Sequence, residues 1–230
     1  MQPCPRITIQ PELHARHGVY IAYACAHAAH CGKTLDAQLA EAEEKARAAY
    51  SPETLREDPR VKALRRLYWR IGIDPTKQRP ASEALIRRVL RGHSIPRINC
   101  AVDAGNIASM ETLIPIGVYD IAKLKPPLTL RHSREGEQFK PIGRRLLRLS
   151  KGQIVLADTE KIIHLYPYRD GEATKVDPTT SDILIVAAGA PGIPQNTVTA
   201  AAQRAATLIR LHCGADTITP VYKAPHPENP

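Results

Sequence analysis

The sequence predicts an α+β fold in which a mixed, mostly antiparallel sheet packs against helices. Short apolar or alternating segments typical of strands are interspersed with longer segments that have helical spacing. The chain has no internal repeat, Walker loop or dinucleotide-binding fingerprint. Its 230 residues, 43% of them hydrophobic, can bury a good core as one domain, or as one domain with an appendage.

The first third of the chain predicts one strand and two helices. Residues 1–18 are expected to form an irregular lead-in, and residues 18–28 alternate as a strand does. Residues 34–50 carry leucine and alanine at helical spacing. Another helix is expected to begin at Asp58, in the favoured order of cap and then proline, and to end at Gly72.

A short basic helix follows the turn residues at 74–80. Ser82 is expected to cap it, Glu83 lies at the positive end of its dipole, and Gly92 ends it. Its arginines share one sector: Arg87, Arg88 and Arg91. Because Glu83 is the only acid within the helix, we expect a patch that faces phosphate. The alternative is a solvated face with local carboxylate partners.

The positive charge of the chain is concentrated around this helix. Residues 60–97 hold eleven basic residues against Asp74 and Glu83, an excess equal to the net charge of +9 for the whole chain. Such a confined field favours docking of a polyanion, with an affinity that falls steeply with salt. Aromatic residues are only 4% of the chain, which argues against platforms that stack bases. The residues expected to bind RNA are Lys77, Arg79, Arg87, Arg88 and Arg91.

The second half of the chain predicts a short helix, a set of strands and a closing helix. The short helix follows Pro96, and a strand is expected within residues 113–121. Further strands are expected at residues 128–131, 153–158, 162–166 and 183–188, with a hairpin loop at 158–161 and a last helix from Thr197 to Gly214.

One stretch of this half resembles a known family. Residues 95–124, IPRINCAVDAGNIASMETLIPIGVYDIAKL, closely resemble the signature of the B3/B4 module of the phenylalanyl-tRNA synthetase beta subunit. Upstream, RIGIDPTKQRPASEALIRRVLRG is similar to freestanding B3/B4 proteins. The resemblance continues in order through LTLRHSREGEQFKPIG, GQIVLADTEKIIHLY and TKVDPTTSDILIV, so that it covers roughly residues 60 to 190. It implies a single B3/B4-like domain over residues 1–220, made of an N-terminal strand and helix (1–58) and a signature core (59–214), with an extended proline-rich tail at 220–230.

In the synthetase, this module implies a site that removes tyrosine wrongly attached to the phenylalanine tRNA. The family pattern has a histidine where this chain has Gly117, and a glutamate that senses the tyrosine hydroxyl where it has Val186. Both departures count against editing of tyrosine, since a buried hydroxyl without its acceptor costs about 1–3 kcal/mol. An apolar pocket near Gly117 and Val186 is expected to take another side chain.

No general base can be assigned among the polar residues near this pocket. Ser109 is a further polar candidate, and the residues expected to line the pocket are Asn99, Asp103, Asn106, Gly117, Glu172, Thr180 and Val186. Helix capping and hydrogen bonding between elements are the structural alternative for Asp103 and Asn106, and a turn after Asp177-Pro178 is the alternative for Thr180.

Three functions follow from these observations. The first is a freestanding tRNA-binding protein of the B3/B4 type; if it is also an enzyme, it is a trans-editing deacylase of misacylated tRNA, an ester hydrolase rather than an aminoacylating ligase. The second is a binder of a free or esterified amino acid, or another small molecule, that kept the pocket and lost the RNA. The third is a domain whose basic face docks on an acidic protein.

The cysteines and histidines complete the inventory. Five scattered cysteines indicate reduced thiols in the cytoplasm. The His and Cys residues between 14 and 31 have ligand chemistry for zinc, but their spacing fits no closed structural site, so neither a metal nor another cofactor is expected. No segment has the length of a membrane span or the apolar core of a signal peptide, which indicates a soluble protein without a membrane partner. The sequence leaves the oligomeric state open.

Overall fold

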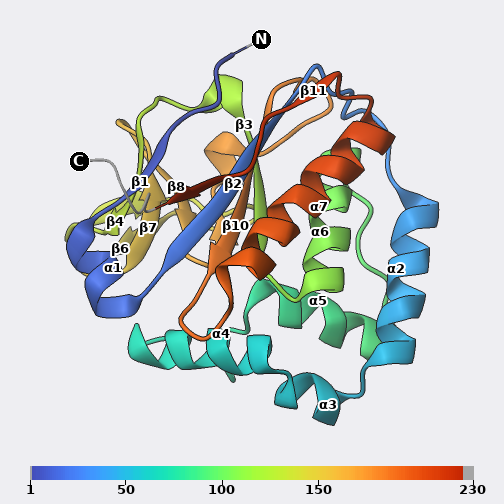
Figure 1. The fold of residues 1–230 in the computed structure, drawn as a ribbon. Coiled ribbons are helices and arrows are strands. Elements are labelled where there is room, and N and C mark those ends of the chain that lie inside the picture. Colours follow the sequence, from blue (N-terminus) through green and yellow to red (C-terminus); the bar gives the residue numbers. More distant parts are fainter. Residues whose placement is uncertain (1, 225–230) are drawn as a thin grey trace.

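Two sheets and a layer of helices make up the computed structural model, which describes residues 2–224 (Figure 1). The central sheet has the order β11-β2-β10-β3, and β12 also pairs with β2. All its pairings are antiparallel. Its strands are β2 (Tyr20–His27), β3 (Ile116–Asp120), β10 (Ile183–Gly189), β11 (Thr217–Ile218) and β12 (Tyr222–Ala224).

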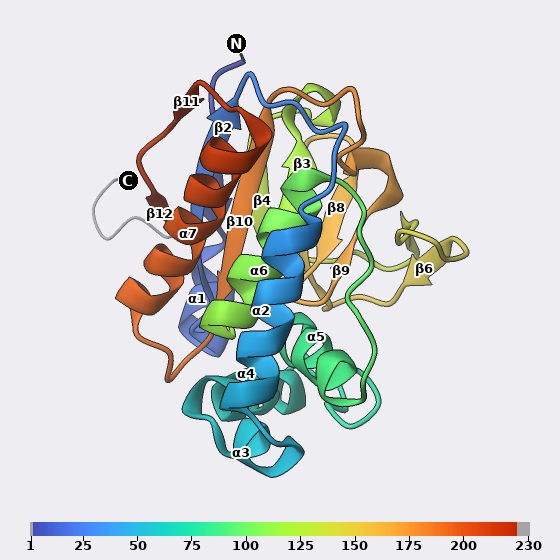
Figure 2. The ribbon, with the colours of Figure 1, turned by 90° about the vertical axis from the view of Figure 1, so that its right-hand side faces the viewer.

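A second sheet covers one face of the central sheet and has the order β1-β4-β7-β8-β9. Only β1 and β4 run parallel in it, so the architecture is mixed, as the sequence predicts. Its strands are β1 (Ile7–Ile9), β4 (Leu128–His132), β7 (Ile154–Ala157), β8 (Ile162–Leu165) and β9 (Arg169–Asp170). A separate hairpin, β5 (Glu137–Phe139) with β6 (Leu147–Leu149), stands out from the body of the molecule (Figure 2).

Helices cover the other face of the central sheet and one end of it (Figures 1 and 2). Helices α2, α6 and α7 lie along the sheet, and α3, α4 and α5 lie at its lower end in Figure 1. The helices are α1 (Pro11–His17), α2 (Asp36–Ala49), α3 (Pro52–Glu57), α4 (Pro59–Arg70), α5 (Ala81–Leu90), α6 (Cys100–Thr112) and α7 (Gln195–Cys213), with short 3-10 turns η1 (Ile121–Lys123) and η2 (Glu172–Thr174).

Strand β10 is buried on both faces, which explains its continuous apolar sequence. Leu184 and Val186 pack into the core between the two sheets. Ile183 and Ile185 pack into the core under the helices. Successive side chains of a strand point to opposite faces, so a central strand between two cores needs apolar residues at every position.

The ends of the chain differ from the sequence-based expectations. Residues 1–18 are not simply irregular, because β1 pairs with β4 and α1 follows it. In the expected tail, Tyr222–Ala224 form a strand on β2, and residues 225–230 lie outside the described part of the chain. Ser82 does not cap α5, since its hydroxyl donates to the Leu113 carbonyl at 2.9 Å.

The cysteines also depart from the expectation of reduced thiols. Cys4 is bonded to Cys25, which attaches the N-terminal segment to β2. Cys100 is paired with Cys213, which joins the start of α6 to the end of α7. Cys31 is free and buried. The scattered spacing could not show these pairs, because the two cysteines of each pair lie on different elements, 21 and 113 residues apart in the chain.

Candidate functional site

An open cleft of about 440 Å³ lies between α6, β3 and the segment 170–178. Its walls are largely apolar, with polar groups at Asn99, Asn106, Asp170, Lys175 and Asp177. The apolar lining residues are Ile98, Val102, Ile116, Val118, Ile142, Val176 and Pro178. Ile98 and Ile142 are 57% and 47% exposed, so the rim of the cleft offers apolar surface to a ligand.

Two of the polar residues predicted for the pocket fix the start of α6. Asn99 caps the helix by accepting from the Val102 amide at 3.0 Å, and its own amide donates to the Val176 carbonyl at 3.4 Å. Asp103 is fully buried and accepts from the backbone amides of Leu35 and Ile98, both at 3.0 Å. Burial raises the pKa of Asp103. Capping and bonding between elements therefore account for both side chains.

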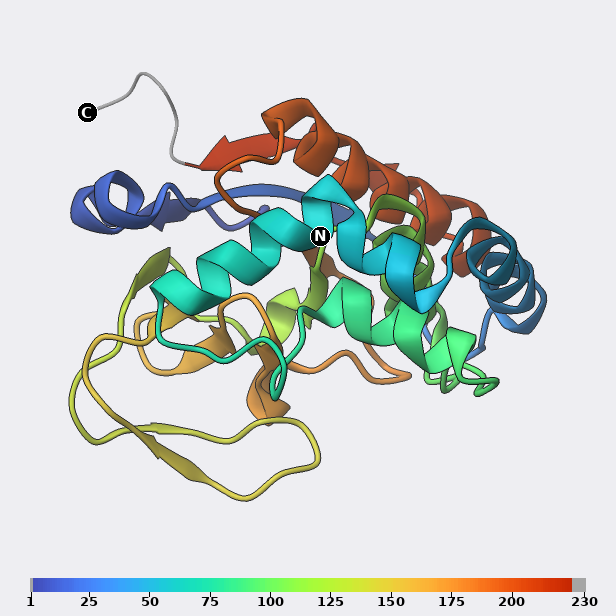
Figure 3. The same cartoon turned by 90° about the horizontal axis from the view of Figure 1, so that it is seen from below.

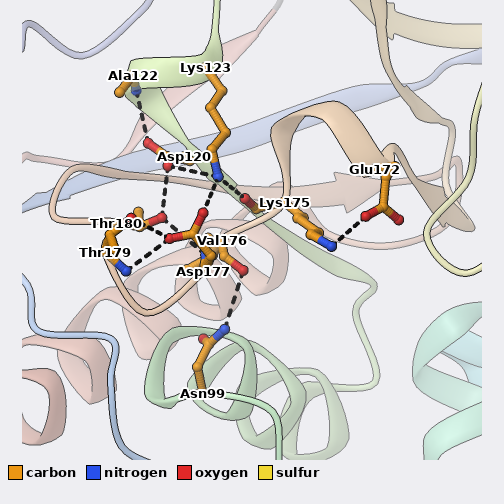
Figure 4. A network of polar contacts seen from close by, with 10 residues as sticks. All are labelled: Asn99, Asp120, Ala122, Lys123, Glu172, Lys175, Val176, Asp177, Thr179 and Thr180. Atoms are coloured by element: carbon orange, nitrogen blue, oxygen red, sulfur yellow. Dashed lines mark hydrogen bonds and ion pairs between the residues drawn. The ribbon is translucent and has the colours of Figure 1, made fainter.

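A network of charges holds the floor of the cleft in place (Figure 4). Lys123 from η1 donates to Asp177 at 2.6 Å and lies 3.2 Å from Asp120. Burial alone would lower the pKa of Lys123, but these two carboxylates raise it, so the ammonium stays charged. Thr180 donates to Asp120 at 2.8 Å and accepts from the Asp177 amide, which makes it a turn residue of this network. Glu172 bonds Lys175 on the outer side.

Asn106 differs from these residues because its side-chain amide makes no hydrogen bond to any residue between 2 and 224. It is half-buried and lines the cleft from α6, beside Gly105. A side-chain amide is both a donor and an acceptor. Of the residues predicted for the pocket, Asn106 is thus the one with polar capacity left for a ligand.

Gly117 and Val186 lie opposite each other on β3 and β10, but in a second and smaller cavity of about 30 Å³. The Tyr119 side chain fills the space next to Gly117: a Cβ at that position would lie 2.1 Å from the tyrosine hydroxyl. The cavity is therefore too small for an amino-acid side chain. Asp170 and Ile116 line both the cleft and this cavity, so the two hollows are neighbours.

The Tyr119 hydroxyl belongs to a buried cluster that the sequence did not indicate. It donates to Asp170 at 2.6 Å and lies 2.7 Å from His164 Nδ1. Burial, followed by the charge of Asp170, raises the pKa of this hydroxyl, so it remains a donor. The cluster fixes the Asp170 side chain at the boundary between the two hollows.

Five of the eleven basic side chains between 60 and 97 are bound to carboxylates. Glu83 is fully buried and receives both Arg65 and Arg87, at 2.5 and 2.6 Å. Burial alone would raise the pKa of Glu83, but the two guanidiniums hold it below its usual value. The other pairs are Arg60 with Asp58, Lys62 with Glu57, and Arg97 with Glu43 and Asp36. The expectation of unpartnered arginines is thus wrong for Arg87, because Glu83, one turn earlier on the same helix, accepts from its guanidinium at 2.6 Å.

The remaining six form no ion pair within residues 2–224. They are Arg66, Arg70, Lys77, Arg79, Arg88 and Arg91. Lys77 and Arg79 belong to the loop 71–80, which is fastened to β9 because Arg169 donates to Gln78 at 3.0 Å. Asp170, which follows Arg169 directly, lines the cleft, so this bond links the loop of Lys77 and Arg79 to a segment that borders the cleft. Within the described residues, the Arg88 guanidinium donates to the Ser94 carbonyl alone, at 2.7 Å.

A second basic segment, missed by sequence reasoning, lies on the hairpin. Residues 140–151 contain five cations and no acid. The sequence does show this run of cations. It was missed because the excess of positive charge in residues 60–97 equals the net charge of the whole chain, which indicates that the rest of the chain is balanced overall. The cations are Lys140, Arg144, Arg145, Arg148 and Lys151; all are exposed, and none forms an ion pair within the described chain.

Neither a metal-binding cluster nor a membrane-spanning helix is present among residues 2–224. No group of three or more His, Cys, Asp or Glu side chains in that range is arranged to hold a metal ion. Of the candidate ligands, Cys25 is bonded to Cys4, and His27 contacts Asp182 at 3.1 Å. Over the same residues, no helix combines the length and the hydropathy needed to cross a bilayer.

A family model settles the ancestry of these elements. The model described as the B3/4 domain matches residues 63–214, more than half of the chain. The chain belongs to the B3/4 domain family. The resemblance found in the signature residues is thereby confirmed, and the matched region contains the cleft, residues 140–151 and all of the first basic segment except Arg60 and Lys62.

Curated relatives of this B3/4 domain protein are phenylalanine–tRNA ligase beta subunits. The subunit from Nitrobacter winogradskyi is 34% identical over 112 residues, which cover 49% of this chain and 14% of the relative. That from Bartonella henselae is 32% identical over 111 residues, with 48% and 14% covered. The chain therefore matches only a small part of the length of these relatives.

A solved structure is also similar. It is an N-terminal fragment of the phenylalanyl-tRNA synthetase beta subunit from Pyrococcus horikoshii. Its TM-score is 0.48 at 13% sequence identity, and the match covers 97% of this chain and 52% of that one.

Proposed function

We propose that this B3/4 domain protein binds tRNA and receives the aminoacylated 3′ end in the cleft between α6, β3 and segment 170–178. One observation carries the proposal: a cleft of about 440 Å³ has apolar walls and an open amide at Asn106, and the segments around it carry cations without a carboxylate partner among residues 2–224. Apolar walls suit an amino-acid side chain, and unpaired cations suit a phosphate backbone. The relatives' names, which place such modules in tRNA ligases, agree with this partner.

The cleft favours an aliphatic or otherwise apolar amino acid. Ile98, Val102 and Ile142 can contact such a side chain, while Asn106 can bond the ester carbonyl or the α-amino group. Tyrosine is disfavoured at Gly117 and Val186, because the cavity there has only about 30 Å³ and the Tyr119 side chain occupies the space beside Gly117. We expect any editing activity to discriminate by size and polarity.

Hydrolysis of the ester is the further part of the proposal. The lining carboxylates Asp170 and Asp177 are already bonded, to Tyr119 and to Lys123. We assign neither as the general base: the bond from Lys123 lowers the pKa of Asp177 and makes it a weak base, and Asp170 is held by Tyr119 and His164. A deacylation at this site would use a water that the substrate's own ribose hydroxyl positions, with the amide of Asn106 stabilising the developing charge.

The test combines binding with deacylation. Uncharged tRNA and a panel of tRNAs charged with different amino acids are compared on wild type, Val102→Trp, which fills the cleft, and Ala48→Trp, a control on the exposed side of α2. We expect wild type and the control to prefer one class of charged tRNA, and Val102→Trp to lose that preference while it still binds uncharged tRNA. Equal binding of charged and uncharged tRNA by wild type would refute the assignment of the cleft.

A free amino acid or other small molecule is the second candidate, because the cleft alone has the volume of a small-molecule site. A thermal-shift screen of free amino acids separates the two. Stabilisation of wild type by a free amino acid, without any binding of tRNA, would favour this candidate.

A further inference from the structure

The hairpin β5–β6 and its tip form the second basic surface of the molecule. We call residues 137–149 the basic arm. The arm projects from the body (Figures 2 and 3) and carries Lys140, Arg144, Arg145 and Arg148 in exposed positions. We propose that the basic arm grips the sugar–phosphate backbone of the RNA whose end enters the cleft. This inference rests on the proposed function and adds a contact surface to it.

The arm is built as an ordered element rather than a loose loop. Phe139 and Leu149 anchor its base, since both are buried in a small core with Val155 and Leu165. The tip is fastened to the cleft segment as well: the Ile142 amide donates to the Asp170 carbonyl at 3.0 Å, and the Glu172 amide donates to the Lys140 carbonyl at 2.9 Å. An arm that is already ordered loses less conformational entropy on binding.

The charge of the arm is not compensated locally. Glu137 forms an ion pair with Arg131. Glu172 accepts hydrogen bonds from Lys175 and from the Gly143 amide. No carboxylate among residues 2–224 pairs with the four cations. Arginine is suited to phosphate because its planar fork can bond two oxygens at once.

The position of the arm favours RNA over a membrane surface. Segment 169–172 is bonded to the arm on one side and, through Arg169 and Gln78, to the loop that carries Lys77 and Arg79. Figure 3 shows that this loop and the arm lie on the same side of the molecule. The two sets of cations therefore flank the cleft, where they can contact the phosphates of an RNA strand that enters it. Ile142 lines the cleft, which leaves Leu146, 54% exposed, as the apolar residue of the arm available to a lipid surface.

The experiment measures binding of a fluorescein-labelled tRNA transcript between 0.05 and 0.2 M KCl. The variant Arg144→Gln/Arg145→Gln is compared with wild type and with Arg47→Gln/Arg210→Gln, which removes the same charge from the exposed faces of α2 and α7. Loss of two phosphate contacts predicts an affinity about 25- to 60-fold lower at 0.1 M salt, and a salt slope lower by about 1.4 to 1.8. The control is expected to stay within about threefold of wild type, because the same change in net charge then lies away from the RNA.

The outcomes separate this inference from the proposed function. Absence of tRNA binding by wild type at every salt concentration would refute the proposed function itself. If wild type binds and the arm variant matches it, only the role of the arm is refuted. A variant that keeps tRNA binding but loses binding to phosphatidylserine-containing vesicles, which wild type retains, would identify the arm as a lipid contact and also refute the inference.

Discussion

Arg87 and Arg145 both lie in arginine-rich runs, yet their surroundings are opposite. Arg87 is 18% exposed and bound to Glu83, a carboxylate with no exposure of its own. Arg145 is exposed on the basic arm and has no carboxylate partner among the described residues. The difference teaches that a basic run shows charge but not availability, because a single buried acid such as Glu83 can bind two of its arginines, one from its own helix and one from α4. We expect the first arginine to act on stability and the second on binding.

The largest loss of stability is expected from the substitution Glu83→Gln. The change leaves the guanidiniums of Arg65 and Arg87 against a neutral side chain. We expect a loss of about 3 kcal/mol in the free energy of unfolding, the lower end for a broken buried pair, because the two arginines are 20% and 18% exposed. Urea denaturation measures it.

The matched control is Glu111→Gln, which breaks the exposed pair with Arg204 and should cost less than about 1 kcal/mol. Equal losses for the two variants would show that Glu83 does not hold α4 and α5 together.

The pH dependence of stability tests whether the charge of Glu83 causes this loss. The pKa of Glu83 is lower in the folded protein than its ordinary value of 4.5. Its contribution to stability is therefore fully present above about pH 4.5 and is lost as the pH falls through the folded-state pKa. The gap in unfolding free energy between wild type and Glu83→Gln should be constant between pH 6 and 8 and should narrow below pH 4.5. A gap that persists unchanged in acid would exclude the charge of Glu83 as its cause.

A smaller effect on binding distinguishes Lys77 from Arg87. Lys77→Gln should lower tRNA affinity about five- to eightfold at 0.1 M salt, the value of one phosphate contact, and change stability by less than about 0.5 kcal/mol. Arg87→Gln should lower the unfolding free energy by about 1–2 kcal/mol and change affinity less than twofold. Salt-dependent fluorescence anisotropy and urea denaturation on the same samples give both values. An affinity loss for Arg87→Gln as large as that for Lys77→Gln would show that Arg87 contacts the tRNA.

The main elements of the fold could be predicted from local patterns. Strand β10 has a continuous apolar sequence, β3 follows the signature helix, and β7 and β8 pair across the expected loop at 158–161. The N-terminal strand β1 could not be predicted in the same way, because it is three residues long and is held by pairing with β4, more than a hundred residues later. Short strands depend on partners that local sequence does not reveal.

The site was predictable only in part, for the same reason. Asn99 and Asn106 were identified by their place in the signature, and both line the cleft. The filling of the space beside Gly117 by Tyr119 could not be inferred, since it depends on a side-chain direction and on the bond to Asp170. The partners of Glu83 lie on two helices, and only one of them, Arg87, has helical spacing from it.

Photo-crosslinking from the 3′ end of a bound tRNA tests the central claim most directly. A tRNA with a photoreactive adenosine at its terminus is bound to wild type and irradiated, and the crosslinked peptide is identified by mass spectrometry. The account predicts crosslinks to residues 98–106 or 170–178, which line the cleft, and their loss in Val102→Trp. Crosslinks confined to α7, which lies on the side of the molecule opposite the basic arm (Figure 3), would contradict it.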